Sequence, residues 1–204
     1  MQKFFSIYLD LVRFLAAMAV FTGHMMSNSI SGHVIWWRLG EYGQICVTIF
    51  FVLSGYVIAY VTSERESIGK IYFMSRVSRL YSVTILALIL TYIFDYFGHI
   101  FDPKLYEEKT IGTVFLKTAT ITGYVSALFF VNEFQVFKFN GIAPGTNFPF
   151  WSLSFEAAYY LIAGLMLFVS KKISIPLILI ILLLGGNAIT ALFPVWCFGF
   201  ILYK

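Results

Sequence analysis

"LDLVRFLAAMAVFTGHMM", residues Leu9–Met26, is apolar over nearly its whole length but carries three ionisable side chains. A helix needs about 20 mainly apolar residues to cross the hydrocarbon core of a bilayer. Asp10, Arg13 and His24 are costly inside a membrane, where such groups usually line a cavity, a relay or a binding site. The stretch therefore predicts a membrane helix with a functional polar face.

The composition of the whole chain is that of a membrane protein. Of its 204 residues, 60% are hydrophobic and 12% are charged, whereas soluble domains carry about 25% charged residues. The net charge of +4 comes from basic residues in short segments between apolar runs, which indicates membrane topology and no nucleic-acid partner. Cys46 and Cys197 lie in apolar runs without metal-ligand spacing, so we expect packing roles and no metal site.

The apolar runs predict an all-α fold, a polytopic transmembrane bundle of about five to seven helices in a single domain, 1–204. The first run lacks a small-residue cleavage site and is expected to remain as a membrane helix. We expect membrane segments at 5–26, 42–62, 78–97, 151–170 and 173–193, with the start of another at 194–204.

The distribution of basic residues predicts the orientation. Segment 63–79 holds the densest cluster of Lys and Arg and should face the cytoplasm, which makes the N-terminus cytoplasmic in a multi-pass protein of the inner (plasma) membrane. Segment 111–131 is ambiguous, because Lys117 and several threonines interrupt it. If it spans fully, Lys171-Lys172 faces outward. If it is re-entrant or interfacial, both basic clusters face the cytoplasm, and we favour this topology.

Arg13 and His24 are predicted to share one helix face. Eleven residues at about 100° each bring His24 back to within about 20° of Arg13, roughly 16 Å further along the axis. We expect both to line a polar channel. Alternatively, Arg13 snorkels to the interface and His24 is a hydrogen-bonded polar residue. Asp10, three residues before Arg13, is expected to be a local ion partner or a helix-start residue.

Glu156 lies in "FPFWSLSFEAAYYL" (148–161), after a loop rich in Gly and Pro that is expected to form a lid or entrance. In the favoured topology this carboxylate is near the outer end of an inward-running helix, at the depth of His24. There it could orient and stabilise an imidazole that acts as a general base. The alternative is an acid in the first turns of a helix capped by Ser152.

Arg76 and Arg79 in "MSRVSRL" form an i, i+3 pair at the predicted cytoplasmic mouth of a helix. Two guanidiniums on one face suit the phosphates of a cytosolic donor. The alternative is a topological anchor that touches anionic lipid. In "IFFVLSGYVIAY" (49–60), Ser54-Gly55 indicates close helix packing, and no nucleophile motif surrounds Ser54.

Four motifs, taken together and in order across residues 9–161, resemble the acyltransferase-3 family of integral membrane acyltransferases. They are "LDLVRFLAAMAVFTGH", with an Arg and a His eleven positions apart, "FFVLSGYVIA", "SRVSRLY" and "FWSLSFEAAYYL".

The resemblance implies transfer of an acyl group, commonly acetyl, from cytosolic acyl-CoA (acetyl-CoA) to a hydroxyl of an extracytoplasmic or lipid-linked carbohydrate, without a metal. Family members acylate O-antigen, exopolysaccharide, Nod factor and macrolides. Carried over by motif, His24 would be the catalytic residue and Arg13 its required partner. Arg76 and Arg79 would hold the donor's phosphates, and Glu156 would lie in the active-site region.

The chain departs from the family in length. Members usually have more membrane helices, so we expect this chain to be the N-terminal portion of the domain, with C-terminal helices missing. A fragment, a truncated product, or a protein completed as a homo-oligomer or by a complementing subunit would each fit. Two other functions remain open, a transporter that uses the same charged groups as a pathway and a non-catalytic assembly partner.

Overall fold

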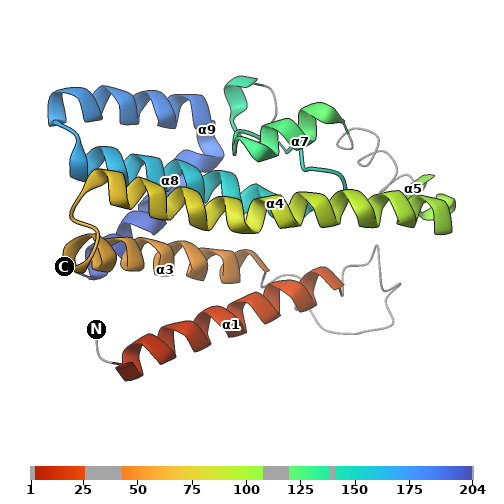
Figure 1. The fold of residues 1–204 in the computed structure, drawn as a ribbon, viewed down its shortest axis with the longest axis horizontal. Helices are drawn as coiled ribbons and strands as arrows, with labels where there is room; N and C mark the ends of the chain where they lie inside the picture. The colour runs from red at the N-terminus through yellow and green to blue at the C-terminus, as the bar shows by residue number, and fades with distance from the viewer. Residues whose placement is uncertain (1–2, 26–42, 108–119, 138–140, 204) are drawn as a thin grey trace. The chain divides into compact units, whose positions relative to one another are not determined.

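The computed structural model describes residues 3–25, 43–107, 120–137 and 141–203, and these residues form helices joined by turns (Figure 1). The helices are α1 (Lys3–Met25), α3 (Gly43–Glu64), α4 (Gly69–Phe101), α5 (Pro103–Glu107), α7 (Ile121–Leu128), α8 (Trp151–Phe168) and α9 (Lys171–Leu202), with 3-10 turns η2 (Gln135–Phe137) and η3 (Phe148–Phe150). The predicted all-α class is confirmed.

Five stretches of helix among the described residues are long and apolar enough to cross a membrane. They are Phe4–His24, Ile45–Glu64, Gly69–Phe101, Phe148–Phe168 and Lys171–Leu202. Large apolar side chains such as Phe14, Leu15 and Phe21 are exposed along α1, an arrangement that suits hydrocarbon rather than water. The chain is therefore a multi-pass helical membrane protein.

The described chain forms two compact units. The first unit comprises residues 1–61 and 192–204, and the second comprises residues 62–191. Each unit has its own packing contacts and is described by itself.

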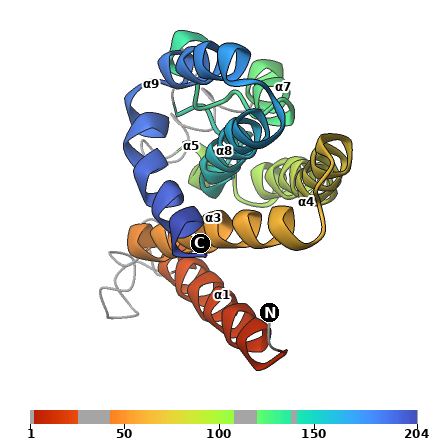
Figure 2. The same cartoon turned by 90° about the vertical axis from the view of Figure 1, so that its left-hand side faces the viewer.

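In the first unit, the last part of α9 crosses α3 at two glycines (Figure 2). A side-chain carbon at Gly55 would overlap the carbonyl oxygen of Trp196, and one at Gly199 would overlap that of Val52. The Trp196 indole donates a hydrogen bond to Ser54 Oγ at 3.3 Å. The predicted packing role of Ser54-Gly55 is confirmed, because only glycine allows the two backbones to approach so closely.

In the second unit, α4 packs lengthwise against α8 (Figure 1). Four buried residues of α4 recur at intervals of four and form a continuous stripe along the helix: Tyr72, Arg76, Leu80 and Thr84. This spacing places them on one helix face. Because two of the four are polar or charged, the contact between α4 and α8 includes polar as well as apolar side chains.

The two helices run antiparallel. A Cβ atom at Gly69, where α4 begins, would lie 3.1 Å from Cβ of Phe168, where α8 ends. Toward the other end of α4, the carboxylate of Asp95 accepts a hydrogen bond from the backbone N–H of Thr146, shortly before α8 begins. This is the relative direction expected of segments 78–97 and 151–170 in the favoured topology, whereas a full span at 111–131 would make them parallel.

Segment 111–131 is described only from residue 120 onward, and its residues 111–119 lie outside the described chain. The described part holds α7, eight residues long and therefore about 12 Å in length. Thr120 caps it, since its hydroxyl accepts a hydrogen bond from the N–H of Gly123 at 3.2 Å. Phe130, just after α7, has a φ of 58° and turns the chain. A helix this short favours the re-entrant or interfacial interpretation.

The predicted boundary between 173–193 and 194–204 is wrong, because the interruption in α9 lies at Gly186, with φ 76° and ψ −166°. Glycine adopts this conformation without strain, and the run Gly185-Gly186-Asn187 is a turn signal inside the apolar pattern. Polar side chains satisfy two carbonyls near the break. Thr190 Oγ1 donates to Leu182 O at 3.2 Å, and the Tyr159 hydroxyl donates to Ile189 O at 2.7 Å.

The expected loop 63–79 is also shorter than predicted. Helix α4 begins at Gly69, so Arg76 and Arg79 lie inside the helix rather than at its mouth. The basic residues suggested a loop because arginine is costly in a membrane segment. In the structure, Glu66 forms an ion pair with Arg76, which lowers that cost and lets the helix begin earlier.

We predict that Gly55→Ala destabilises the protein, because its new methyl group meets rigid backbone at Trp196. The expected loss is about 1–3 kcal/mol, typical of overpacking. Thermal unfolding in detergent measures the effect. Gly43→Ala is the control, because a side-chain carbon there has no neighbour within 4 Å. Equal melting temperatures for the two variants would contradict the close approach.

Candidate functional site

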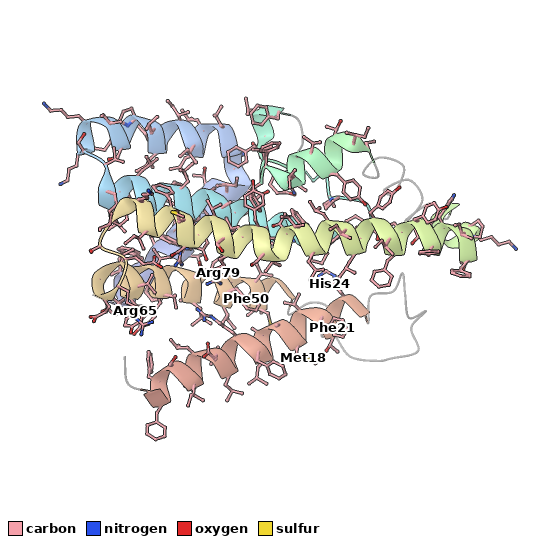
Figure 3. The ribbon with its side chains drawn as sticks, in the orientation of Figure 1. Met18, Phe21, His24, Phe50, Arg65 and Arg79 are labelled. Atoms are coloured by element: carbon pink, nitrogen blue, oxygen red, sulfur yellow. The ribbon has the colours of Figure 1, made fainter. Side chains whose placement is uncertain are left out.

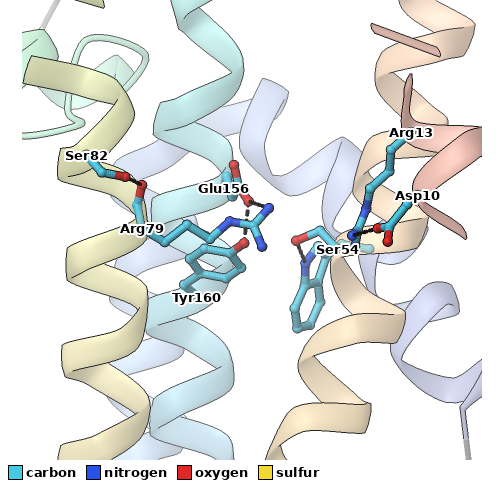
Figure 4. A network of polar contacts seen from close by, with 8 residues as sticks. Asp10, Arg13, Ser54, Arg79, Ser82, Glu156 and Tyr160 are labelled. Carbon is cyan, nitrogen blue, oxygen red and sulfur yellow. Dashed lines mark hydrogen bonds and ion pairs between the residues drawn. The ribbon is translucent and has the colours of Figure 1, made fainter. Parts of the chain in front are cut away.

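The second unit contains a polar cluster formed by Arg79 of α4 and by Glu156 and Tyr160 of α8 (Figure 4). Arg79 Nη2 lies 3.6 Å from Glu156 Oε1. The hydroxyl of Tyr160 donates a hydrogen bond to the same oxygen. The side chain of Arg79 is 48% exposed and that of Glu156 is 21% exposed, so the guanidinium remains accessible to a ligand.

The start of α8 tests the predicted cap at Ser152. α8 has no acidic residue in its first turn, and Glu156 follows later. Ser152 donates its hydroxyl to the carbonyl of Pro149 at 3.1 Å and does not cap the helix. The predicted cap at Ser152 is therefore wrong, whereas Glu156 does lie in the second turn of α8. Glu156 and Tyr160 are one turn apart on the same face of α8, which lets one accept the other's hydrogen bond.

The predicted separation of the arginine pair from Glu156 is also wrong. The sequence placed the arginines at the cytoplasmic mouth and Glu156 near the opposite surface. Because α4 begins at Gly69, Arg79 lies about 15 Å along the helix. Antiparallel packing then brings it level with the first half of α8, where its guanidinium meets the carboxylate of Glu156.

Arg76 occupies a different environment from Arg79. Its side chain is buried, and its Nη2 donates a 2.8 Å hydrogen bond to Glu66 Oε1. Its guanidinium carbon lies 5.6 Å from the ring centre of Tyr72 and 5.5 Å from that of Tyr160, within the range of cation–π attraction. Arg76 is thus fixed by the protein, whereas Arg79 has room to bind a ligand.

Tyr160 connects the two arginines. Its ring packs against Arg76, its hydroxyl binds Glu156, and its backbone carbonyl accepts a 2.8 Å hydrogen bond from the hydroxyl of Tyr72. The carboxylate that faces Arg79 is therefore held by a residue that Arg76 helps to position. Arg76 can therefore influence the site through Tyr160, although its own charge is paired with Glu66.

We predict that Arg76→Met costs about 3–5 kcal/mol of stability, because it leaves the carboxylate of Glu66 buried without its cation. The double variant Arg76→Met/Glu66→Leu should be more stable than Arg76→Met alone, because it removes both charges. Equilibrium unfolding in detergent measures all three proteins. If the losses of Arg76→Met and Glu66→Leu simply add in the double variant, the two residues do not form the pair described.

Asp95 fixes the loop that leads into α8. Its carboxylate accepts bonds from the backbone N–H of Thr146 at 3.0 Å and from the hydroxyl of Thr146 at 2.5 Å. Beside this, the amide of Asn147 donates to the hydroxyl of Thr91 at 3.0 Å. Gly145 has a φ of +57°, and a side-chain carbon there would overlap Asp95. Asp95 was not among the predicted site residues, although a lone carboxylate in an apolar helix is a signal for a structural or binding role.

A second buried polar group that was not among the predicted site residues involves Ser154 of α8. Asn132 Oδ1 accepts a 2.5 Å hydrogen bond from Ser154 Oγ, and both residues are fully buried. The neighbouring Glu133 is buried as well, and its burial raises the pKa of the carboxyl to about 7, although a hydrogen bond from the Gly141 backbone lowers it in part. The detectable signal was the polar pair inside "FFVNEF".

We predict that loss of the proton from Glu133 lowers the stability of the folded protein as pH rises. Its pKa is 4.5 ordinarily and about 7 in the folded protein, so between these values the folded state binds more protons than the unfolded state. Stability must then fall as pH rises from about 4.5 to about 7. Melting temperatures across this window should fall less steeply in Glu133→Gln than in the wild type.

The matched control for this titration is Glu64→Gln, which removes an exposed carboxylate elsewhere in the chain. It should keep the wild-type slope. A slope that is unchanged in Glu133→Gln would contradict the burial of an ionisable Glu133.

Arg13 and His24 both lie on α1, the single helix predicted for them. Arg13 Nη1 is 3.4 Å from Asp10 Oδ1, which confirms Asp10 as a local ion partner. His24 is exposed in the last turn of α1, beyond Met18 and Phe21 (Figure 3). These residues belong to the first unit and Glu156 to the second, so the pairing of His24 with Glu156 stays a prediction.

Comparison with known proteins places the chain among acyltransferases. The profile of the acyltransferase-3 family, described as an acyltransferase domain, matches residues 6–203. Over 161 residues the chain is 29% identical to the O-acetyl transferase of Shigella phage Sf6, covering 76% of this chain and 44% of that protein. Over 168 residues it is 26% identical to the acyltransferase MdmB of Streptomyces mycarofaciens, covering 80% and 40%. The chain thus spans less than half the length of these relatives, and no solved structure matches it significantly.

Proposed function

Because the chain belongs to the acyltransferase-3 family, we propose that it transfers an acyl group, commonly acetyl, from cytosolic acyl-CoA to a hydroxyl of an extracytoplasmic or lipid-linked carbohydrate. The observation that carries the proposal is the cluster of Arg79, Glu156 and Tyr160, an accessible cation beside a held carboxylate within membrane helices. The name O-acetyl transferase of the phage relative supports acetyl as the group and a hydroxyl as its acceptor.

Arg79 is the residue we assign to the phosphates of the donor. Its side chain is 48% exposed, and its Nη2 lies 3.6 Å from Glu156 Oε1, longer than a hydrogen bond. The guanidinium can therefore turn toward an anion and bind it through two N–H groups. Arg76 is buried against Glu66 and two tyrosine rings. We assign it a positioning role through Tyr160 rather than direct phosphate contact.

His24 is the residue we assign to proton transfer. A histidine has an ordinary pKa near 6.5, so its neutral imidazole can take the proton of the acceptor hydroxyl. The hydroxyl oxygen then attacks the thioester carbonyl carbon, the carbon–sulfur bond breaks, and the coenzyme A thiolate leaves and accepts a proton from the imidazolium. Arg13 supports His24 from the same helix, and Glu156 lies in the active-site region.

The orientation we propose places the N-terminus in the cytoplasm and the protein in the inner membrane. Within the second unit, antiparallel packing puts the start of α4, with Lys70, at the same end as the start of α9, with Lys171 and Lys172. Both basic clusters can then face the cytoplasm together, as the positive-inside rule favours.

The proposal predicts loss of transfer when His24 is removed. The purified chain is incubated with radiolabelled acetyl-CoA and cell-envelope glycans, and label in the glycan fraction is counted. His24→Ala should lower the rate by about 100-fold or more, the usual contribution of a general base.

Phe21→Leu is the matched control for His24→Ala, because Phe21 is an exposed residue one helical turn earlier on α1. It should transfer label at the wild-type rate. A folded wild-type chain that transfers no label, or a His24→Ala variant as active as Phe21→Leu, would overturn the proposed function.

A further inference from the structure

The second unit contains a pocket that the polar cluster does not use. It lies at the end of α4 away from Arg79, against α7, and its volume is about 430 Å³, within the ~300–1,000 Å³ range of small-molecule sites. Its described lining includes three tyrosines and three further polar residues: Tyr92, Tyr96, Tyr124, Asp95, His99 and Thr120.

The tyrosines form two walls of the pocket. The rings of Tyr92 and Tyr96 are nearly parallel, with centres 6.5 Å apart and planes 18° apart. The ring of Tyr124 meets that of Tyr92 edge to face, with centres 6.3 Å apart and planes 79° apart. Both Tyr92 and Tyr96 are more than half exposed, so their electron-rich ring faces are available to a ligand.

Polar groups complete the pocket. The carboxylate of Asp95 is buried in its wall and is held in place by Thr146. Burial, together with the nearby charge of Asp95 and the ring of Tyr92, raises the pKa of Tyr124 to about 12. The phenol of Tyr124 therefore keeps its proton and can donate a hydrogen bond, while the carboxylate can only accept.

We propose that this pocket binds one pyranose ring of the acceptor carbohydrate. A pyranose has an apolar face of C–H groups, whose slightly positive hydrogens pack against the negative faces of aromatic rings. Its hydroxyl groups could meet the polar lining residues, among which Asp95, His99 and Tyr124 offer acceptors and donors. The assignment of the ligand as the acceptor rests on the proposed function.

A hydrocarbon chain fits the same walls less well. It would gain contact with the rings, but it would offer no hydrogen-bond partner to the phenol hydroxyls, which costs free energy. A sugar can pack its C–H face against the rings and also form hydrogen bonds with the polar groups. The pocket also lies far from the donor end of α4, since sixteen residues separate Asp95 from Arg79, about 24 Å along the helix. Donor phosphates and acceptor sugar would therefore approach from opposite ends of α4.

Saturation-transfer NMR tests this binding directly, on the full chain in lipid nanodiscs and without acyl donor. The probes are the methyl α-pyranosides of glucose, galactose, mannose and rhamnose, with hexanol as the apolar probe. Wild type should transfer saturation to the ring C–H protons of at least one glycoside. Tyr92→Ala and Tyr96→Ala should each reduce it by roughly fivefold or more, because each removes an aromatic face.

Two further variants separate loss of stacking from loss of structure. Phe94→Ala removes a ring from the same turn of α4, 67% exposed against 62% for Tyr92, and it should keep the wild-type signal because Phe94 does not line the pocket. Tyr92→Phe keeps the ring and should retain most of the signal. No saturation of any glycoside in wild type, equal loss in Phe94→Ala, or a Tyr92-dependent signal for hexanol alone would overturn the proposal.

The outcome is independent of the acyl-transfer assay. If label is transferred to glycans but no glycoside binds, this inference fails and the proposed function stands. If glycosides bind through Tyr92 but no label is ever transferred, the proposed function fails and the pocket remains a sugar site.

Discussion

Antiparallel packing of α4 on α8 is the constraint on which the second unit depends, and polar contacts set its register. Tyr72 binds the backbone of Tyr160, Arg79 meets Glu156, and Asp95 holds the loop before α8 at Thr146. Within a membrane, no water is present to satisfy such groups when they lose their partners. A shift of either helix would therefore leave several of them unpaired at once.

That register makes the two arginines unequal. Arg76 is enclosed by Glu66 and by the rings of Tyr72 and Tyr160, whereas Arg79 stays half exposed beside Glu156. Since the hydroxyl of Tyr160 binds Glu156, the buried arginine shapes the accessible site without entering it. In this account the same α4 helix presents a cation to the donor and, about 24 Å further along, an aromatic pocket to the acceptor.

The sequence predicted the helices, the location of Arg13 and His24 on one helix, and the ion pair with Asp10, because these follow from local composition and helical spacing. It also identified Gly55, since a small residue in an apolar helix has few other uses. It could not reveal contacts between distant residues. Asp95 and Thr146 are 51 positions apart, and no periodicity joins them. The early start of α4 could not be predicted, because Arg76 is typical of a loop until its partner Glu66 is known. The Gly185-Gly186 pair, in contrast, is a local signal for the break in α9.

The central claim is that Arg79 and Glu156 act as one functional pair, and a double-mutant cycle on the rate of acetyl transfer tests it most directly. Arg79→Gln, Glu156→Gln and the double variant are compared with wild type under saturating acceptor. Because each single change disrupts the same pair, the double variant should lose no more than about the worse single variant. Losses that multiply in the double variant, or a single variant with the wild-type rate, would contradict the account.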